Sequence, residues 1–88
     1  MEIYVTKHAL FEALRRGISL DLIKGVAESP QQEIASTGQR KICQSKFVDK
    51  QTGKDMLIRV VIEDTDDVRY IITVYRTSKI DKYWEVTE

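Results

Sequence analysis

The apolar residues of this 88-residue chain change their spacing once, at Pro30, and this change limits the folds that the chain can adopt. Before Pro30 they recur every three or four residues, as on one side of a helix, whereas after it they alternate, as on one face of a strand. Helices followed by strands predict an α+β domain in which the helices cover one face of an antiparallel sheet. The chain is long enough for one core, so we expect a single domain over residues 1–88.

Two short helices are expected between a brief first strand, residues 1–5, and Pro30. Thr6 can cap the first helix, and Gly17 suits the left-handed residue that ends it. Ser19 can cap the second helix, which Pro30 terminates. Because so few residues separate them, the two helices should form an antiparallel or steeply angled hairpin.

The remainder of the chain predicts a β-meander of three to four strands. Residues 39–48, 56–63 and 70–77 have the alternation of strands, and residues 32–36 are a weaker candidate. In the segment 56–63, Arg59 lies out of phase with the apolar alternation, which places it on the face away from the helices. A lone charge there needs either a salt bridge, to Glu63 or Asp55, or a role in a site.

The charges balance, with 14 basic and 14 acidic residues, which argues against broad, charge-driven binding of nucleic acid. Their distribution is uneven, however. Residues 38–54 and 68–84 are mainly basic, and residues 55–67 between them are mainly acidic. A local basic face is therefore compatible with zero net charge.

Metal, cofactor and membrane classes have little support in the sequence. The only cysteine, Cys43, cannot form an internal disulfide, and with the only histidine, His8, it is too little for a structural zinc site. No apolar run approaches the roughly 20 residues of a membrane span, and no signal segment opens the chain. We expect a cytoplasmic protein without a cofactor or a metal.

The C-terminal segment, residues 70–84, has the composition of an RNA-contacting surface. It interleaves basic residues that can grip phosphates with rings that can stack on bases: Arg76, Lys79 and Lys82 with Tyr75, Tyr83 and Trp84. A last core strand with inward aromatic residues and solvated lysines would have a similar composition, and both interpretations stay open. The segment 78–88 is also a candidate docking site for a partner.

Four short segments resemble a bacterial domain family of unassigned function that is grouped with the RelE, ParE and BrnT toxin superfamily. They are Thr6-Lys7-His8-Ala9, Arg16-Gly17-Ile18-Ser19, Arg59-Val60-Val61 and Ile72-Thr73-Val74-Tyr75-Arg76-Thr77. Glu12 departs from the family, whose members often carry a basic residue there. The resemblance implies a RelE-like fold and cleavage of mRNA, free or on the ribosome, by a toxin that a partner antitoxin restrains. The ParE branch attacks DNA gyrase instead.

The resemblance also implies a metal-independent site built from arginines, lysines and a tyrosine. By position, its catalytic residues would be Arg59, Arg76, Tyr83, Lys46 and His8, and its RNA or partner contacts Lys79, Lys82, Trp84 and Tyr75. His8 is also compatible with a neutral, hydrogen-bonded histidine near the start of a helix. The predicted function is that of an endoribonuclease toxin. The alternative is a non-catalytic protein-interaction module of the same fold.

Overall fold

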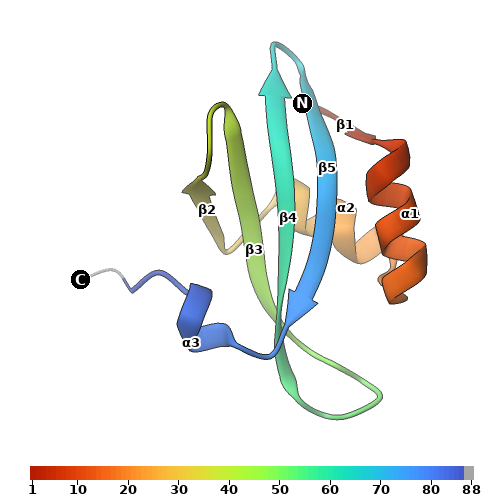
Figure 1. Ribbon diagram of the computed structural model, residues 1–88, viewed down its shortest axis with the longest axis vertical. Helices are drawn as coiled ribbons and strands as arrows, with labels where there is room; N and C mark the ends of the chain where they lie inside the picture. The colour runs from red at the N-terminus through yellow and green to blue at the C-terminus, as the bar shows by residue number, and fades with distance from the viewer. Residues whose placement is uncertain (87–88) are drawn as a thin grey trace.

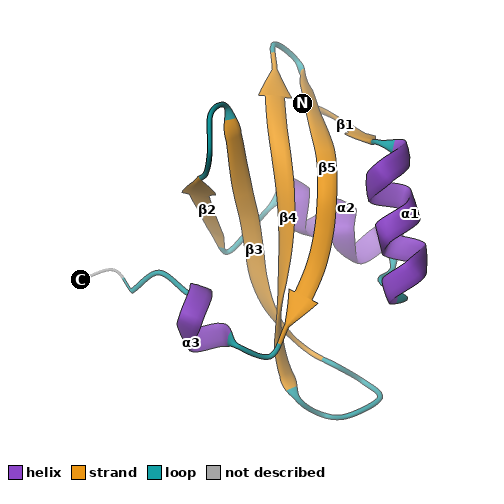
Figure 2. Cartoon of the chain, viewed as in Figure 1, coloured by secondary structure: helices purple, strands orange, loops and turns teal. Residues whose placement is uncertain are grey.

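The computed structural model describes residues 1–86, which form five strands and three short helices (Figure 1). Their order is β1 (Glu2–Val5), α1 (Lys7–Arg16), α2 (Leu20–Glu28), β2 (Gln32–Ala35), β3 (Arg40–Val48), β4 (Asp55–Thr65), β5 (Val68–Thr77) and α3 (Ile80–Tyr83). Figure 2 shows that the long strands β3, β4 and β5 form most of the sheet. None of the helices in this part of the chain has the length and apolar composition needed to cross a membrane.

The sheet is mixed, with the strand order β1-β5-β4-β3-β2. β1 lies parallel to β5, and the three other strand pairs are antiparallel. The predicted fold class, a RelE-like two-helix hairpin on an antiparallel meander of three to four strands, is therefore wrong. Alternation along a strand identifies its two faces but not its neighbour or its direction, so the parallel pairing of β1 with β5 could not be predicted from it.

The predicted helix boundaries are confirmed. The Thr6 hydroxyl caps α1 by accepting a hydrogen bond from the backbone N–H of Ala9, and Gly17 ends the helix with a φ of 66°. Ser19 caps α2 by accepting a hydrogen bond from the N–H of Leu22. The short helix α3, by contrast, was not predicted from the basic and aromatic pattern of the C-terminal segment.

Helices α1 and α2 cover one face of the sheet and form the core with it. The buried residues of this helix-covered face are Cys43, Ile58, Val60, Ile62, Ile71 and Val74, which pack against Ala9, Ala13, Ile18, Ile23, Val26 and Ala27 of the helical layer. Residues one position away on each strand point to the opposite side, which we call the open face. Helix α3, Trp84 and Glu85 lie on that side, where they contact Gln44, Lys46 and Gln32.

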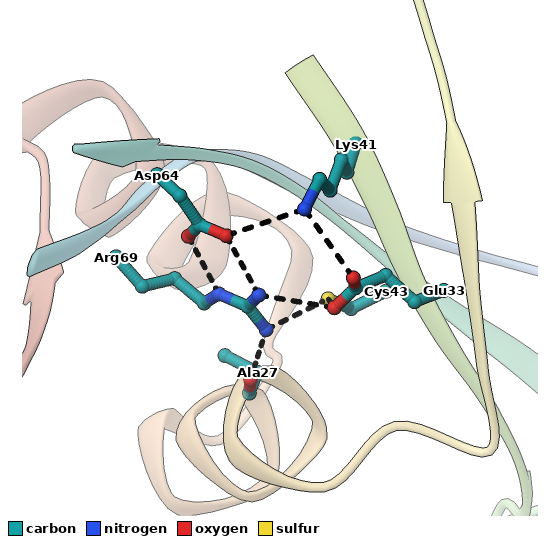
Figure 3. Close-up of polar contacts among 6 residues, drawn as sticks. All are labelled: Ala27, Glu33, Lys41, Cys43, Asp64 and Arg69. Atoms are coloured by element: carbon teal, nitrogen blue, oxygen red, sulfur yellow. Dashed lines mark hydrogen bonds and ion pairs between the residues drawn. The ribbon is translucent and has the colours of Figure 1, made fainter. Parts of the chain in front are cut away.

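Arg69 on β5 ties the end of α2 to the sheet. Its guanidinium donates two hydrogen bonds to the carboxylate of Asp64, at 2.7 and 2.8 Å, and one to the carbonyl oxygen of Ala27, at 2.8 Å. Figure 3 shows how these groups converge with those of Glu33, Lys41 and Cys43. The Arg69 hydrogen bonds hold the pKa of Asp64 below its usual value. We call these six residues the Arg69 cluster.

Candidate nucleic-acid interface

Four polar residues stand side by side across the open face. Register pairs Gln32 with Gln44, Gln44 with Arg59, and Arg59 with Tyr75, so one residue comes from each of β2, β3, β4 and β5. Laterally paired residues point to the same side of a sheet, and their side chains therefore meet. We call these four residues the cross-strand row.

Arg59 lies at the centre of this row and is only 7% exposed. Its Nε donates a hydrogen bond to Oε1 of Gln44 at 2.9 Å, and its Nη1 donates one to the Tyr75 hydroxyl at 2.6 Å. The guanidinium carbon lies 4.2 Å from the centre of the Tyr83 ring, a cation–π contact. All three partners are neutral. Within residues 1–86, the ion pairs do not include Arg59, so neither expected salt bridge, to Glu63 or to Asp55, forms.

Residues 80–85, which follow β5, fold back onto the row and cover it. Gln44 Nε2 donates a hydrogen bond to the Tyr83 carbonyl oxygen at 3.1 Å. Gln32 donates to the Glu85 carbonyl oxygen at 2.6 Å and accepts from the Glu85 N–H at 3.1 Å. Figure 1 shows α3 beside the β2–β3 side of the sheet. Tyr83 and Trp84 therefore pack on the sheet rather than extend from it, although both remain half-exposed.

Two lysines border the covered row. The Lys46 ammonium lies 4.0 Å from the centre of the Trp84 ring, and the Lys82 ammonium lies 5.2 Å from that of Tyr83. Both lysines are exposed to solvent. Cations that alternate with partly exposed rings match the requirements of single-stranded nucleic acid, whose phosphates need charge and whose bases stack on flat groups.

Tyr75 adds a group that can donate a proton. Its hydroxyl oxygen accepts the hydrogen bond from Arg59 Nη1, so the hydroxyl proton is directed away from that arginine. The proton can then be donated to an oxygen of a bound molecule. Arg59 and Tyr75 together could thus place a fixed positive charge and a hydroxyl donor near one phosphate group.

The open face gathers most of the residues predicted for the site. The structure brings together Lys46, Arg59, Tyr75, Lys82, Tyr83 and Trp84. Lys79 lies exposed directly before α3, without a contact to the row. Thr87 and Glu88 of the predicted docking segment lie outside the described residues.

Arg76 and His8 do not join this group. Arg76 follows Tyr75 on the same strand and pairs with Ile58, so it points to the helix-covered side. The expectation that Arg59 and Arg76 share one phosphate-sized volume is wrong, because neighbouring residues of a strand face opposite ways. His8 is exposed on α1, which packs on the other side of the sheet.

Glu12, the residue that departs from the resembled family, pairs with two arginines in the next turn of α1. Its carboxylate accepts hydrogen bonds from Arg15 at 2.9 and 3.1 Å and from Arg16 at 3.2 Å. The hydrogen bond from Arg15, opposed in part by burial, lowers the pKa of Glu12 to about 2. These contacts hold Arg16 at the end of α1, in agreement with a helix-terminal charge.

Gln32 and Gln44 are functional candidates that the sequence did not reveal. The alternation of β3 places Gln44 on the open face, where a glutamine is ordinarily expected to be solvated. Only the lateral register shows that it holds Arg59. Within residues 1–86, no group of three or more His, Cys, Asp or Glu side chains is arranged so that it could hold a metal ion.

Comparison with known proteins gives one family. The model of a family described as "Domain of unknown function (DUF4258)" matches residues 5–76. This range includes the whole cross-strand row but stops before Lys82, Tyr83 and Trp84. No curated protein and no solved structure matches the chain significantly, and nothing in these comparisons links it to the RelE, ParE and BrnT superfamily.

Proposed function

This chain belongs to DUF4258, a family of domains of unknown function, and we propose that it is the toxin of a toxin–antitoxin pair that cleaves mRNA without a metal. The observation that carries this proposal is the environment of Arg59. It is a buried cation held by an amide, a hydroxyl and a ring, with no carboxylate paired to it in residues 1–86. An uncompensated buried charge is costly, and an RNA phosphate would supply the missing negative charge.

Cleavage of RNA requires that a ribose 2′-hydroxyl be aligned and deprotonated, that the negative charge of the phosphorane be stabilised, and that the 5′-oxygen be protonated. A solvent water molecule would accept the proton of the 2′-hydroxyl, Arg59 would stabilise the charge of the phosphorane, and the Tyr75 hydroxyl would donate its proton to the leaving 5′-oxygen. Lys46 and Lys82 would bind the flanking phosphates, and Tyr83 and Trp84 would stack on bases. Because the Tyr83 ring now lies on the guanidinium, a phosphate reaches Arg59 only after this ring has moved aside.

A non-catalytic protein-interaction module is the second candidate. The net charge of zero and the covering of Arg59 by Tyr83 favour it, because RNA binding generally draws on a large excess of basic groups. In this case an acidic side chain of the partner would neutralise Arg59. The proposed partners are accordingly a cognate antitoxin and mRNA for the toxin, and a protein alone for the module.

Induction of the chain alone in bacteria tests the proposal. We expect growth arrest and shortened mRNA in the cytoplasm, and we expect Arg59→Met to relieve both. Arg76→Met is the matched control. It also removes an arginine charge, but Arg76 follows Tyr75 on β5 and so points to the other side of the sheet from Arg59. Purified wild-type chain should also cleave RNA in the presence of EDTA.

Two outcomes would contradict the proposal, the first for its site and the second for the toxin itself. Equal arrest by the wild type and Arg59→Met would remove the cross-strand row from the site. The absence of both arrest and RNA cleavage, together with capture of a protein partner that Arg59→Met weakens, would favour the interaction module.

A further inference from the structure

Arg76, which lies outside the proposed RNA site, borders a separate cleft at the other side of the sheet. This cleft has a volume of about 630 Å³ and lies between the turn that joins α1 to α2 and the loop that follows β3. The volume falls within the roughly 300–1,000 Å³ of sites for small molecules. All of its lining residues lie within the range that the family model matches.

The lining combines apolar side chains with positive charge. Ile18, Leu22, Phe47 and Ile58 contribute the apolar part, and Ile58 is fully buried beneath it. Arg76 provides an exposed guanidinium. In residues 1–86 the ion pairs do not include Arg76, so no carboxylate lies within 4.0 Å of its guanidinium nitrogens.

The loop side of the cleft reinforces this positive charge. Lys50 is exposed there. Asp49, the acidic residue of the lining, is engaged by its own loop, because its carboxylate accepts hydrogen bonds from the Gln51 N–H at 3.0 Å and the Thr52 hydroxyl at 3.2 Å. With Arg76 and Lys50 against Asp49, the lining therefore carries a net charge of +1, while the wall between these groups is apolar.

We propose that the cleft binds a small organic anion, namely a carboxylate or similar acidic group on an aromatic or branched aliphatic body. The body would lie on the apolar wall, and the acidic group would receive paired hydrogen bonds from the Arg76 guanidinium, whose planar fork matches a carboxylate. This site is independent of the proposed action on RNA, since it lies on the opposite side of the sheet from Arg59.

Titration with 8-anilinonaphthalene-1-sulfonate, an aromatic anion whose fluorescence rises in apolar surroundings, tests the site on the full chain. We expect saturable binding of one dye per chain. Arg76→Gln should weaken it about tenfold, the loss of one charge-assisted contact, and Arg76→Lys should retain part of it. Lys24→Gln, which removes an exposed cation of α2 that does not line the cleft, is the matched control and should leave binding unchanged.

A neutral dye with the same rings, N-phenyl-1-naphthylamine, separates charge recognition from apolar burial. It should bind the wild type and Arg76→Gln equally, and circular dichroism should show that both are folded. Absence of saturable binding by the wild type, or equal affinity of the wild type and Arg76→Gln for the sulfonate, would overturn the proposal. Loss of binding in Leu14→Gln would also overturn it, because that result would place the dye on α1, where Leu14 is 74% exposed.

Discussion

The two least exposed arginines of the sheet, Arg69 and Arg59, differ in the charge of the groups that surround them. The Arg69 side chain is 12% exposed and meets two carboxylates, those of Asp64 and Glu33, within 3.0 Å. Arg59 is 7% exposed and meets neutral groups only. Balanced charge makes the first arginine part of the framework, whereas unbalanced charge leaves the second ready for an anion. Burial alone would not have distinguished them.

Replacement of Arg69 should give the largest effect. Arg69→Met leaves the Asp64 carboxylate and the Ala27 carbonyl oxygen without their donor, and we expect the free energy of unfolding to fall by about 2–4 kcal/mol. Urea denaturation would measure it. Arg40→Met is the control, because Arg40 pairs with Glu63 at 3.7 Å on the exposed surface and should cost less than about 1 kcal/mol. Equal losses in the two variants would show that the Arg69 cluster is not a framework.

The thiol of Cys43 lies 3.5 Å from Nη1 of Arg69 and should make the stability of the protein fall at alkaline pH. Burial, opposed in part by Arg69, raises the pKa of Cys43 from 9.0 to about 11. The unfolded chain therefore loses this proton first. The protonated Cys43 thiol therefore contributes its full share of the free energy of unfolding below about pH 9, and this contribution is lost as the pH rises through about 11.

We expect this loss to be on the order of 2 kcal/mol, measured as the difference between urea midpoints at pH 8 and pH 11. Cys43→Ala should lack this part of the alkaline decline, while other titrating groups affect both chains alike. A parallel decline in the wild type and Cys43→Ala would contradict the assignment.

Replacement of Arg59 should change the stability much less than replacement of Arg69. We expect the free energy of unfolding to change by less than about 1 kcal/mol, because relief of a buried, unbalanced charge offsets the lost hydrogen bonds to Gln44 and Tyr75. The same urea experiment as for Arg69→Met would measure it. A loss as large as that of Arg69→Met would mean that Arg59, too, belongs to the framework.

The smallest effect is expected at the border of the row. Lys46→Met removes an exposed cation–π contact with Trp84 and should lower the free energy of unfolding by about 0.5 kcal/mol. Thermal unfolding would detect this as a small shift of Tm. Lys79→Met, which removes an exposed cation outside the row, should leave Tm unchanged, and a shift there equal to that of Lys46→Met would remove the contact as the cause.

The sequence predicted local features well because these depend on neighbouring residues. Thr6, Gly17 and Ser19 mark helix ends through their own side chains or lack of one, and the phase of Arg59 follows from alternation along β4. The parallel pairing of β1, the hold of Gln44 on Arg59 and the return of Tyr83 to the sheet depend on residues far apart in the chain. No local pattern shows which distant residues will meet. The placement of Arg76 with Arg59 failed for another reason, because Arg76 pairs with Ile58 and so faces the helix-covered side.

The pairing of β1 with β5 also determines when the sheet can be completed during synthesis of the chain. Thr6 donates to the carbonyl oxygen of Ile71 through both its hydroxyl, at 2.7 Å, and its N–H, at 3.2 Å. Among the strands of residues 1–86, β1 is an edge strand whose one neighbour is β5. As the ribosome synthesises the chain from its N-terminus, the first strand has no partner until residues 68–71 have emerged. Contacts so distant along the chain slow folding. The sheet is therefore completed only after residues 68–71 have left the ribosome, and a shorter nascent chain leaves its first strand unpaired.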